Sequence, residues 1–404
     1  MELVSRTFES LKVRNFRLFF FGQGLSLCGT WAQTIALSWL VLQITGSGTQ
    51  IGFVVAAQFL PVLLFGIYGG VIADRFDKRH VMYFTQSLSG ALALVLGLLV
   101  VTGHIQLWEV YAVAIGLGVA QLLDSPARQS FIIEMVGPDR VRNAVTLNSM
   151  MVNVARIIGP SIAGILIVTV GTGQCFIINA VSYAAVIFAL LSMRSSELRP
   201  TPRSEKEPGQ VMAGLRYVWG SSILRITVLV MFVVGTLAYE FPVIFPLFAT
   251  QTLHGNAKTY AAMTTAMGIG AIVGGLLTAS QAQPTLRYYL NMCLAFGGSL
   301  LLLAFMPTID LSLVVLLIAG ALSVSLLSTG LSLVQLRSRP EMRGRALSLW
   351  AMAFLGTTPI GGPIIGYIGD HASPRAGIAV GGAAAVVAAI TGLLFSSSQA
   401  GVDD

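Results

Sequence analysis

The chain reads Gly70-Val71-Ile72-Ala73-Asp74-Arg75-Phe76-Asp77-Lys78-Arg79 between two long apolar runs, so five charged side chains lie close together there. The runs cover residues 51–73 and 81–101, and each is close to the roughly 20 helical residues that cross the hydrocarbon core of a bilayer. Charges between two such runs are typical of a loop at a membrane surface. We therefore predict two membrane-spanning helices joined by a short charged turn.

The composition extends this interpretation to the whole chain. Of 404 residues, 55% are hydrophobic and 10% are charged, whereas a soluble domain has about 25% charged residues. Twelve apolar runs are long enough to span a bilayer: 18–44, 51–73, 81–101, 107–123, 144–170, 175–193, 223–250, 260–279, 288–306, 311–334, 346–368 and 377–395. Unpaired backbone amides are not tolerated in hydrocarbon, and barrel strands need only about 9 to 11 residues, so the runs must be helices. The predicted fold is an all-α membrane protein with twelve transmembrane helices.

The basic residues are distributed unevenly between the loops. All but three of the 24 Lys and Arg residues lie on one side of the predicted spans. The exceptions are Lys258 and Arg375, on the other side, and Arg156, inside a span. Because positive charge is retained on the cytoplasmic side, we expect a multi-pass protein of the cell membrane with both termini cytoplasmic. The net charge of +7 needs no nucleic-acid partner, since the basic face meets anionic lipid headgroups.

A polar segment divides the spans into two sets of six. We predict an N-terminal six-helix bundle over 1–193, a cytoplasmic linker over 194–222 and a C-terminal six-helix bundle over 223–404. Residues 158–164 of the fifth span resemble residues 361–366 of the eleventh, which indicates two pseudo-symmetric halves. The expected helix-packing residues in these segments are Gly159, Pro160, Gly164, Gly362 and Pro363. Two related halves are what a rocking-bundle transporter requires, because one half swings against the other around a midplane site.

The charged turn resembles the motif G-x-x-x-D-R-x-G-R-R of the major facilitator superfamily, which lies between the second and third helices. The matching positions are Gly70, Asp74, Arg75, Lys78 and Arg79. Asp77 replaces the second glycine, and a positive φ angle in the turn is therefore less accessible, although Asp tolerates it better than most residues. The resemblance covers essentially the whole chain and implies a secondary transporter.

Two further segments narrow the resemblance. Residues 153–164 resemble the Gly-Pro motif that exporting, proton-coupled members carry in the fifth helix. Residues 15–19 and 124–131 are similar to the branch that contains enterobactin-type siderophore exporters and macrolide-efflux proteins. The resemblance implies a proton-coupled antiporter that exports an amphipathic small molecule, either a drug or a siderophore-like metabolite.

The charged turn is predicted to form a cytoplasmic gate. Asp74 could accept hydrogen bonds from the amino end of the eleventh helix near Gly344 and Arg345, where the helix dipole is positive. Lys78, Asp124 and Arg128 are expected at a similar depth, where they could form a small charge network. The alternative is that these charges, Arg75 and Arg79 above all, only follow the positive-inside bias.

Arg156 is the candidate substrate residue. It lies about twelve residues, or roughly 18 Å, into the fifth span and so near the midplane. An arginine there costs at least about 2.5 to 3.5 kcal/mol, so it must face a wet cavity or a partner. We expect it to bind an anionic group of the substrate. The alternative is a permanent pair that fixes helix packing.

Glu240, in the outer part of the seventh span, is the candidate proton carrier. A carboxyl partly withdrawn from water can load and release a proton as its exposure alternates. The alternative is an interfacial acid that stays ionised in external water.

Polar and aromatic residues at helical spacing indicate candidate cavity-lining positions. Gln23, Thr30 and Thr34 share a face of the first span, and Trp31 could stack on a cyclic substrate. A second stripe on the tenth span contains Ser325, Ser328, Thr329 and Ser332. Close helix packing is the alternative explanation of such small hydroxyl residues.

Nothing in the chain favours an enzyme. It has no phosphate-binding Gly-rich loop, and its four histidines are not paired at metal spacing, so we expect no cofactor and no metal. The expected partners are a small-molecule substrate, a proton gradient and the lipid bilayer, with the protein as a monomer. A nutrient uptake permease remains an alternative, as does a transport-inactive membrane sensor or an intramembrane enzyme.

Overall fold

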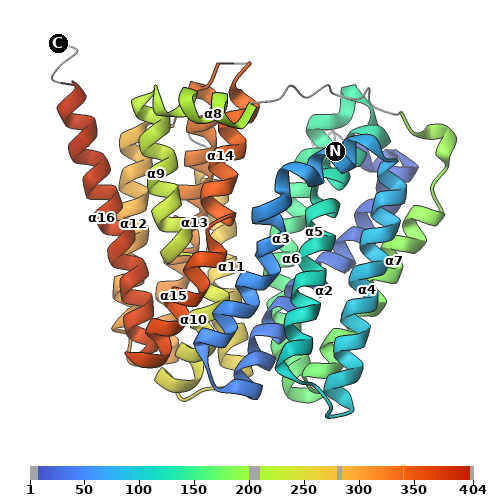
Figure 1. The fold of residues 1–404 in the computed structure, drawn as a ribbon, viewed down its shortest axis with the longest axis horizontal. Coiled ribbons are helices and arrows are strands. Elements are labelled where there is room, and N and C mark those ends of the chain that lie inside the picture. Colours follow the sequence, from blue (N-terminus) through green and yellow to red (C-terminus); the bar gives the residue numbers. More distant parts are fainter. Residues whose placement is uncertain (1–7, 200–209, 280–283, 340, 401–404) are drawn as a thin grey trace. The chain divides into compact units, whose positions relative to one another are not determined.

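Helices account for nearly every described segment of the chain in this computed structural model (Figure 1). The structure describes residues 8–199, 210–279, 284–339 and 341–400, apart from the side chains of 67–74, 153, 210, 211, 279 and 397–400. Within these residues, twelve helical segments are long and apolar enough to cross a membrane. This confirms the predicted fold class.

The chain divides into two compact units, which we describe separately. The first comprises Met1–Leu40 and Ala57–Glu205, and the second comprises Val41–Ala56 and Lys206–Asp404. Residues 41–56 contain the end of the first span and the start of the second, so both of these long helices pass from one unit into the other. The predicted division at 194–222 stays a prediction, and part of that linker, 200–209, lies outside the described residues.

Six long helices contribute to the first unit: α2 (Arg14–Thr45), α3 (Gly48–Arg75), α4 (Lys78–Val101), α5 (Leu107–Val136), α6 (Val141–Thr169) and α7 (Thr172–Leu191). Helix α4 packs against α5 and α7, and α6 packs against the same two helices. A buried aromatic core lies near the start of α2, where Phe19 meets Phe131 edge to face at 6.2 Å. Asn15 exchanges two hydrogen bonds with the backbone of Arg194, at 2.9 and 3.0 Å, so the start of α2 is held at the end of α7.

The second unit contains the remaining helices: α8 (Gln210–Trp219), α9 (Ser222–Leu237), α10 (Phe241–Leu247), α11 (Ala257–Ala279), α12 (Leu286–Ala304), α13 (Ile309–Arg337), α14 (Arg343–Leu355), α15 (Thr358–His371) and α16 (Pro374–Ala400). Helix α11 packs on α13, α12 packs on α16, and α9 packs against α14, α15 and α16. The short helix α8 lies across the ends of α9 and α14 (Figure 1).

Two spans of the second unit are broken in the middle. The seventh span stops at Leu237 and resumes as α10, whereas the eleventh stops at Leu355 and resumes as α15. Each second half has a proline in its first turn, Pro242 or Pro359, which lacks the N–H that would continue the hydrogen-bond ladder. The predicted span 346–368 lies within the observed span Arg343–His371, and the break inside it was not predicted.

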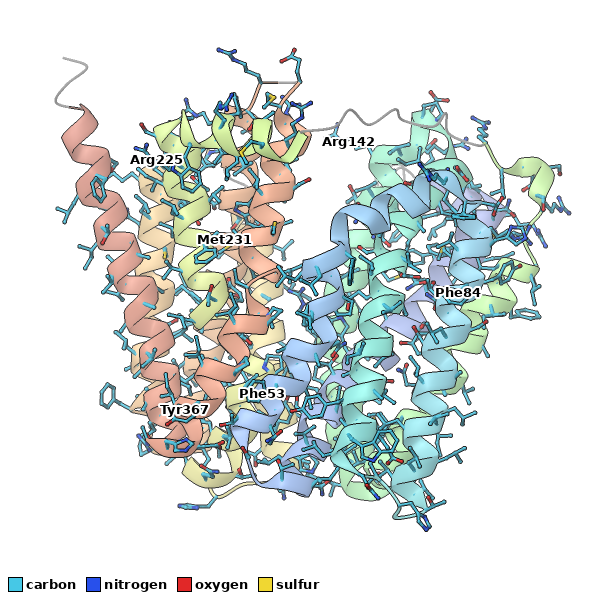
Figure 2. All side chains as sticks on the ribbon, in the orientation of Figure 1. Phe53, Phe84, Arg142, Arg225, Met231 and Tyr367 are labelled. Atoms are coloured by element: carbon cyan, nitrogen blue, oxygen red, sulfur yellow. The ribbon has the colours of Figure 1, made fainter. Side chains whose placement is uncertain are left out.

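The two ends of the second unit differ in charge. Arg225, near the start of α9, lies at one end, and Tyr367, near the end of α15, lies toward the other (Figure 2). Helices α8, α9, α13 and α14 begin or end at the first of these and carry most of the arginines of the unit. We call it the basic end, and we call the other, where α15 ends, the far end.

Candidate functional site

The last residues of the predicted gate motif belong to an ordered charged region in the first unit. Lys78 begins α4, and its ammonium group lies 2.8 Å from Oε1 of Glu134 on α5. The two side chains are only 12% and 9% exposed. Glu134 was not among the predicted site residues, because a single acid near the end of a long helix carries no motif.

Asp77 begins α4 in a way that explains the missing glycine of the motif. Its backbone has φ −60° and ψ 120°, so the turn does not use the positive φ that a glycine would provide. Its carboxylate accepts a hydrogen bond from the backbone N–H of His80 at 3.0 Å. Asp77 is therefore the N-cap of α4, for which Asp is one of the preferred residues.

Asp124 and Arg128 lie one turn apart on α5, with Arg128 Nε 3.3 Å from Asp124 Oδ2. The other carboxylate oxygen of Asp124 accepts hydrogen bonds from Thr85, at 3.0 Å, and from Gln86, at 2.8 Å. Lys78 pairs with Glu134 and not with Asp124. In place of one three-residue network, the structure therefore shows two separate ion pairs. The Lys78–Glu134 pair joins α4 to α5, whereas the Asp124–Arg128 pair lies within α5.

The other residues of the gate motif differ in their surroundings. Arg79, on α4, donates from Nε to the carbonyl of Leu190 at 3.1 Å and from a guanidinium N–H to the hydroxyl of Ser195 at 2.7 Å. These hydrogen bonds connect the start of α4 to the end of α7 and the residues that follow it. Arg75 is exposed. Gly70 and Asp74 lie within helix α3, but their side chains are outside the described part of the chain, and the gating contact of Asp74 stays a prediction.

Two predicted substrate residues meet on neighbouring helices of the first unit. The guanidinium carbon of Arg156, on α6, lies 5.0 Å from the centroid of the Trp31 ring, on α2. Both side chains are half-buried. A Cβ added at Gly159, one turn after Arg156, would collide with the Cβ of Trp31, so the glycine permits the close approach of α6 to α2. We call this contact the Arg156–Trp31 pair.

The remaining predicted residues of α2 lie on either side of this pair. Thr34, one turn after Trp31, is half-buried and donates to the carbonyl of Thr30 at 3.1 Å. Gln23 is 4% exposed. In the predicted packing segment of α6, Pro160 and Gly164 are buried inside the helix.

Glu240 occupies the break between α9 and α10 and is 3% exposed. The carbonyl oxygen of this residue accepts from the N–H groups of Val243 and Ile244, both at 3.1 Å, and so begins α10. The carboxylate lies beside the first turn of α15, where a Cβ added at Gly361 would be 2.9 Å from Oε1. Among the described residues, Oε1 has no hydrogen-bond partner. The side chain is therefore withdrawn from bulk solvent.

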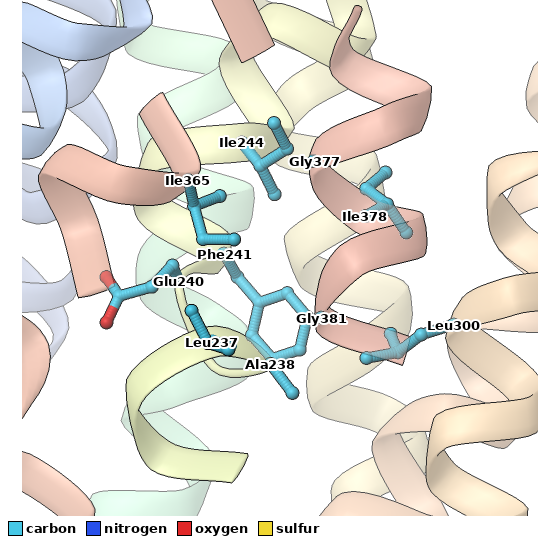
Figure 3. Close-up of a pocket in the computed structure, with 10 residues that line it drawn as sticks. All are labelled: Leu237, Ala238, Glu240, Phe241, Ile244, Leu300, Ile365, Gly377, Ile378 and Gly381. Carbon is cyan, nitrogen blue, oxygen red and sulfur yellow. The ribbon is translucent and has the colours of Figure 1, made fainter. Parts of the chain in front are cut away.

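The cavity next to Glu240 is small and largely apolar. It is lined mainly by apolar side chains, including Phe241, Leu300 and Ile378, and the carboxylate of Glu240 points away from them (Figure 3). Its volume admits no more than about one water molecule.

One residue of the polar stripe on the tenth span contacts a neighbouring helix. Ser325 accepts a hydrogen bond from Thr278 at 2.9 Å and donates to the carbonyl of Gly274 at 3.3 Å. Both partners lie on α11, against which α13 packs closely. The structure therefore favours the packing explanation at Ser325.

Comparison with known proteins gives a consistent set of relatives. A family model described as transmembrane secretion effector matches residues 5–402. The multidrug efflux pump Tap of Mycobacterium tuberculosis is 27% identical over 88% of this chain and 88% of its own length. The staphyloferrin A transporter of Staphylococcus aureus is 24% identical over 88% of this chain and 89% of its own length. The enterobactin exporter EntS of Citrobacter koseri is 25% identical over 94% of this chain and 90% of its own length.

A solved structure shares the fold at low sequence identity. The bacterial homologue of the human lysosomal transporter Spinster superposes with a TM-score of 0.72 at 14% identity, covering 94% of each chain.

Proposed function

Since the chain belongs to the transmembrane secretion effector family of the major facilitator superfamily, and is a multi-pass secondary transporter, we propose that it exports an amphipathic small molecule in exchange for protons. Family membership confirms the superfamily that the residues around Asp74 predicted. Export is supported by the relatives, of which one is an efflux pump and one a siderophore exporter.

The Arg156–Trp31 pair is the observation that supports the substrate class. The guanidinium of Arg156 lies over the indole ring of Trp31, 5.0 Å from its centroid, so a planar cationic group and an aromatic ring are stacked at one place. This combination suits a planar or cyclic molecule that carries an anionic group. Drugs and siderophore-like metabolites both include compounds of this kind.

Glu240 supports the proton half of the proposal. It is a buried acid at the point where the seventh span is interrupted and where the second half of the eleventh begins. Broken helices near a binding site are a recurring feature of secondary transporters, because the interrupted backbone can respond to an ion. Protonation of Glu240 would neutralise the carboxylate beside the first turn of α15.

The architecture that we propose for transport has two six-helix halves, 1–193 and 223–404, joined by a cytoplasmic linker. Both termini face the cytoplasm, and the protein works as a monomer. The residues around Asp74 close the cytoplasmic mouth.

The proposal is tested in two steps. A panel of drugs and of catecholate and carboxylate siderophores is first screened in cells that lack their own efflux pumps, for compounds whose accumulation falls when the protein is expressed. The purified protein is then placed in proteoliposomes with an imposed pH gradient, and each active compound is added. We expect the compound to dissipate the gradient in the direction of antiport.

The outcomes separate the alternatives. Movement of compound and protons in the same direction would identify an uptake permease. If compounds that pass the cell screen leave the gradient unchanged with correctly inserted protein, proton exchange is excluded. If no compound passes the screen, a sensor or an enzyme is favoured over an exporter. Arg142→Lys on α6 is the matched control for substitutions of Arg156, because Arg142 is exposed.

A further inference from the structure

Helix α8 presents an exposed apolar face. Met212, Leu215 and Trp219 are 62%, 38% and 48% exposed, and their spacing of three and four residues places them on one side of the helix. Gly214 and Val218 are buried and form a different side, which packs on the rest of the second unit. Large apolar side chains on a short surface helix are costly to leave in water. This face is therefore expected to meet another apolar environment.

The position of α8 identifies that environment. The helix runs across the ends of α9 and α14 at the basic end, and not along the spans (Figure 1). A Cβ added at Gly214 would be 2.9 Å from the Cβ of Arg345, so α8 rests directly on the first turn of α14. Helices with one apolar face that lie along a membrane surface sit between the lipid headgroups and the acyl chains, where tryptophan is also preferred. The exposed face of α8 is thus placed for contact with lipid.

Five arginines surround this helix. Arg216 is on α8 itself and is exposed. A guanidinium N–H of Arg225, labelled in Figure 2, reaches the carbonyl oxygen of Trp219 at 3.5 Å. The backbone N–H of Arg339 donates to the hydroxyl of Tyr217 on α8 at 2.9 Å. Two more arginines belong to the first turn of α14, on which α8 rests. We call the whole set the α8 arginines: Arg216, Arg225, Arg339, Arg343 and Arg345.

The charges of this set are not balanced within the protein. Among the described residues, none of the α8 arginines has a carboxylate within ion-pair distance. Glu341 lies between Arg339 and Arg343 in the chain, but it is exposed and pairs with neither. In the same described part of the chain, Nε of Arg343 is buried and has no hydrogen-bond partner. The α8 arginines are therefore an excess of positive charge that an external anion can neutralise.

A phospholipid with a net negative headgroup matches both features. A guanidinium donates two parallel hydrogen bonds to a phosphate, and α9 and α14 both begin at this end, where their dipoles are positive. The acyl chains of the same molecule can cover the apolar face of α8. A soluble phosphate would satisfy the arginines but would leave that face in water.

We propose that α8 and the α8 arginines form a binding site for an anionic phospholipid of the leaflet at the basic end. The headgroup phosphate contacts the arginines, and the upper part of the acyl chains contacts Met212, Leu215 and Trp219. Because α8 rests on the first turn of α14, the bound lipid also holds the start of the eleventh span. The site is independent of the proposed export, since no transported compound takes part in it.

The site is tested through the fluorescence of Trp219. The chain has five tryptophans, and the other four are replaced by phenylalanine. The full-length protein is placed in nanodiscs of equal parts phosphatidylglycerol and phosphatidylcholine, of which only one carries bromine on its acyl chains. Bromine quenches tryptophan on contact, so the two preparations report which lipid lies beside Trp219. We expect stronger quenching by brominated phosphatidylglycerol, equivalent to a local preference of about fivefold or more.

A second single-tryptophan protein is the control for the reporter. Trp108, at the start of α5 in the first unit, is 64% exposed and lies outside the α8 site. With Trp108 as the only tryptophan, the two brominated lipids should quench equally. Equal quenching at Trp219 as well would overturn the proposal.

Charge substitutions test the arginines. Arg216→Gln with Arg343→Gln should abolish most of the preference for phosphatidylglycerol at Trp219. Lys258→Gln with Arg142→Gln removes the same charge from exposed positions elsewhere and should leave the preference unchanged. If the first pair does not yield monodisperse protein, Arg216→Gln alone, at an exposed position, should give a smaller decrease. A preference that survives loss of the α8 arginines would overturn their role.

Added salts distinguish a lipid from a soluble anion. Inorganic phosphate should reduce the quenching by brominated phosphatidylglycerol no more than chloride does at the same ionic strength. Stronger displacement by phosphate would assign the arginines to a soluble anion and overturn the lipid site. None of these measurements needs a transported compound, so failure of the lipid site leaves the export proposal intact, and failure to find a transported compound leaves the lipid site intact.

Discussion

The ammonium group of Lys78 lies 2.8 Å from a carboxylate oxygen of Glu134, and the two side chains are among the least exposed charges of the first unit. Lys78 belongs to the gate motif, whereas Glu134 lies 56 positions later on another helix. Removing one partner of such a buried pair leaves an uncompensated charge, which costs about 3 to 5 kcal/mol.

We therefore expect Lys78→Met to lower the thermal unfolding temperature of the detergent-solubilised protein clearly, and Glu134→Leu to do the same. The double variant should recover most of the loss, because no charge is then left unpaired. Glu197→Gln is the control, since its pair with Arg194 is exposed and worth no more than about 1 kcal/mol. A loss in the double variant equal to the sum of the two single losses would show that the two residues are not coupled.

Arg156 is expected to bind the substrate through two parallel hydrogen bonds. Arg156→Lys keeps the positive charge but loses the planar fork, so we expect binding of the transported compound to weaken about tenfold. Equilibrium binding to the purified protein measures the effect, and Arg142→Lys should leave the affinity unchanged. Unaltered affinity in Arg156→Lys would show that the Arg156–Trp31 pair is only structural.

Glu240 is expected to carry the exchanged proton. Glu240→Gln keeps the shape of the side chain but cannot ionise, so transport should lose its dependence on an imposed pH gradient while binding persists. Proteoliposome assays with and without the gradient measure this dependence, and Asp310→Asn serves as the control. If Glu240→Gln responds to the gradient as the parent does, another group carries the proton.

Asp74 is expected to hold the cytoplasmic gate closed. Asp74→Asn should insert normally and reduce transport sharply, because an amide accepts hydrogen bonds from a helix terminus less strongly than a carboxylate does. The comparison is Asp77→Asn in the same turn, which should have little effect since Asn caps a helix about as well as Asp. Full transport by well-expressed Asp74→Asn would exclude the gating role.

Local composition was sufficient to predict the spans. A helix in a bilayer must be long and apolar regardless of its neighbours, so the run 81–101 corresponds closely to α4. The run 107–123 covers only the first part of α5, which continues to Val136. The break in the eleventh span was not predicted, because Gly356 and Pro359 are tolerated within membrane helices when neighbouring groups satisfy the backbone.

The candidate site was predictable only in part. Arg156, Trp31 and Glu240 attract attention individually, because polar or charged residues in apolar runs are costly. Their surroundings were not predictable: Trp31 as the neighbour of Arg156 depends on the close approach of α6 to α2 at Gly159. Equally, the burial of Glu240 depends on the first turn of α15.

The amino-acid sequence by itself determined that this protein is a twelve-span membrane transporter, because span length, apolar composition and the residues around Asp74 are properties of short segments. Only the tertiary structure decided which charges are paired and which helix ends are capped. Lys78 pairs with Glu134, and the backbone N–H of Gly48, at the start of α3, donates to Asp370 on α15. In both cases the partners are far apart in the chain. Such partners are selected by which helix faces pack together, and that packing is a property of the folded protein as a whole.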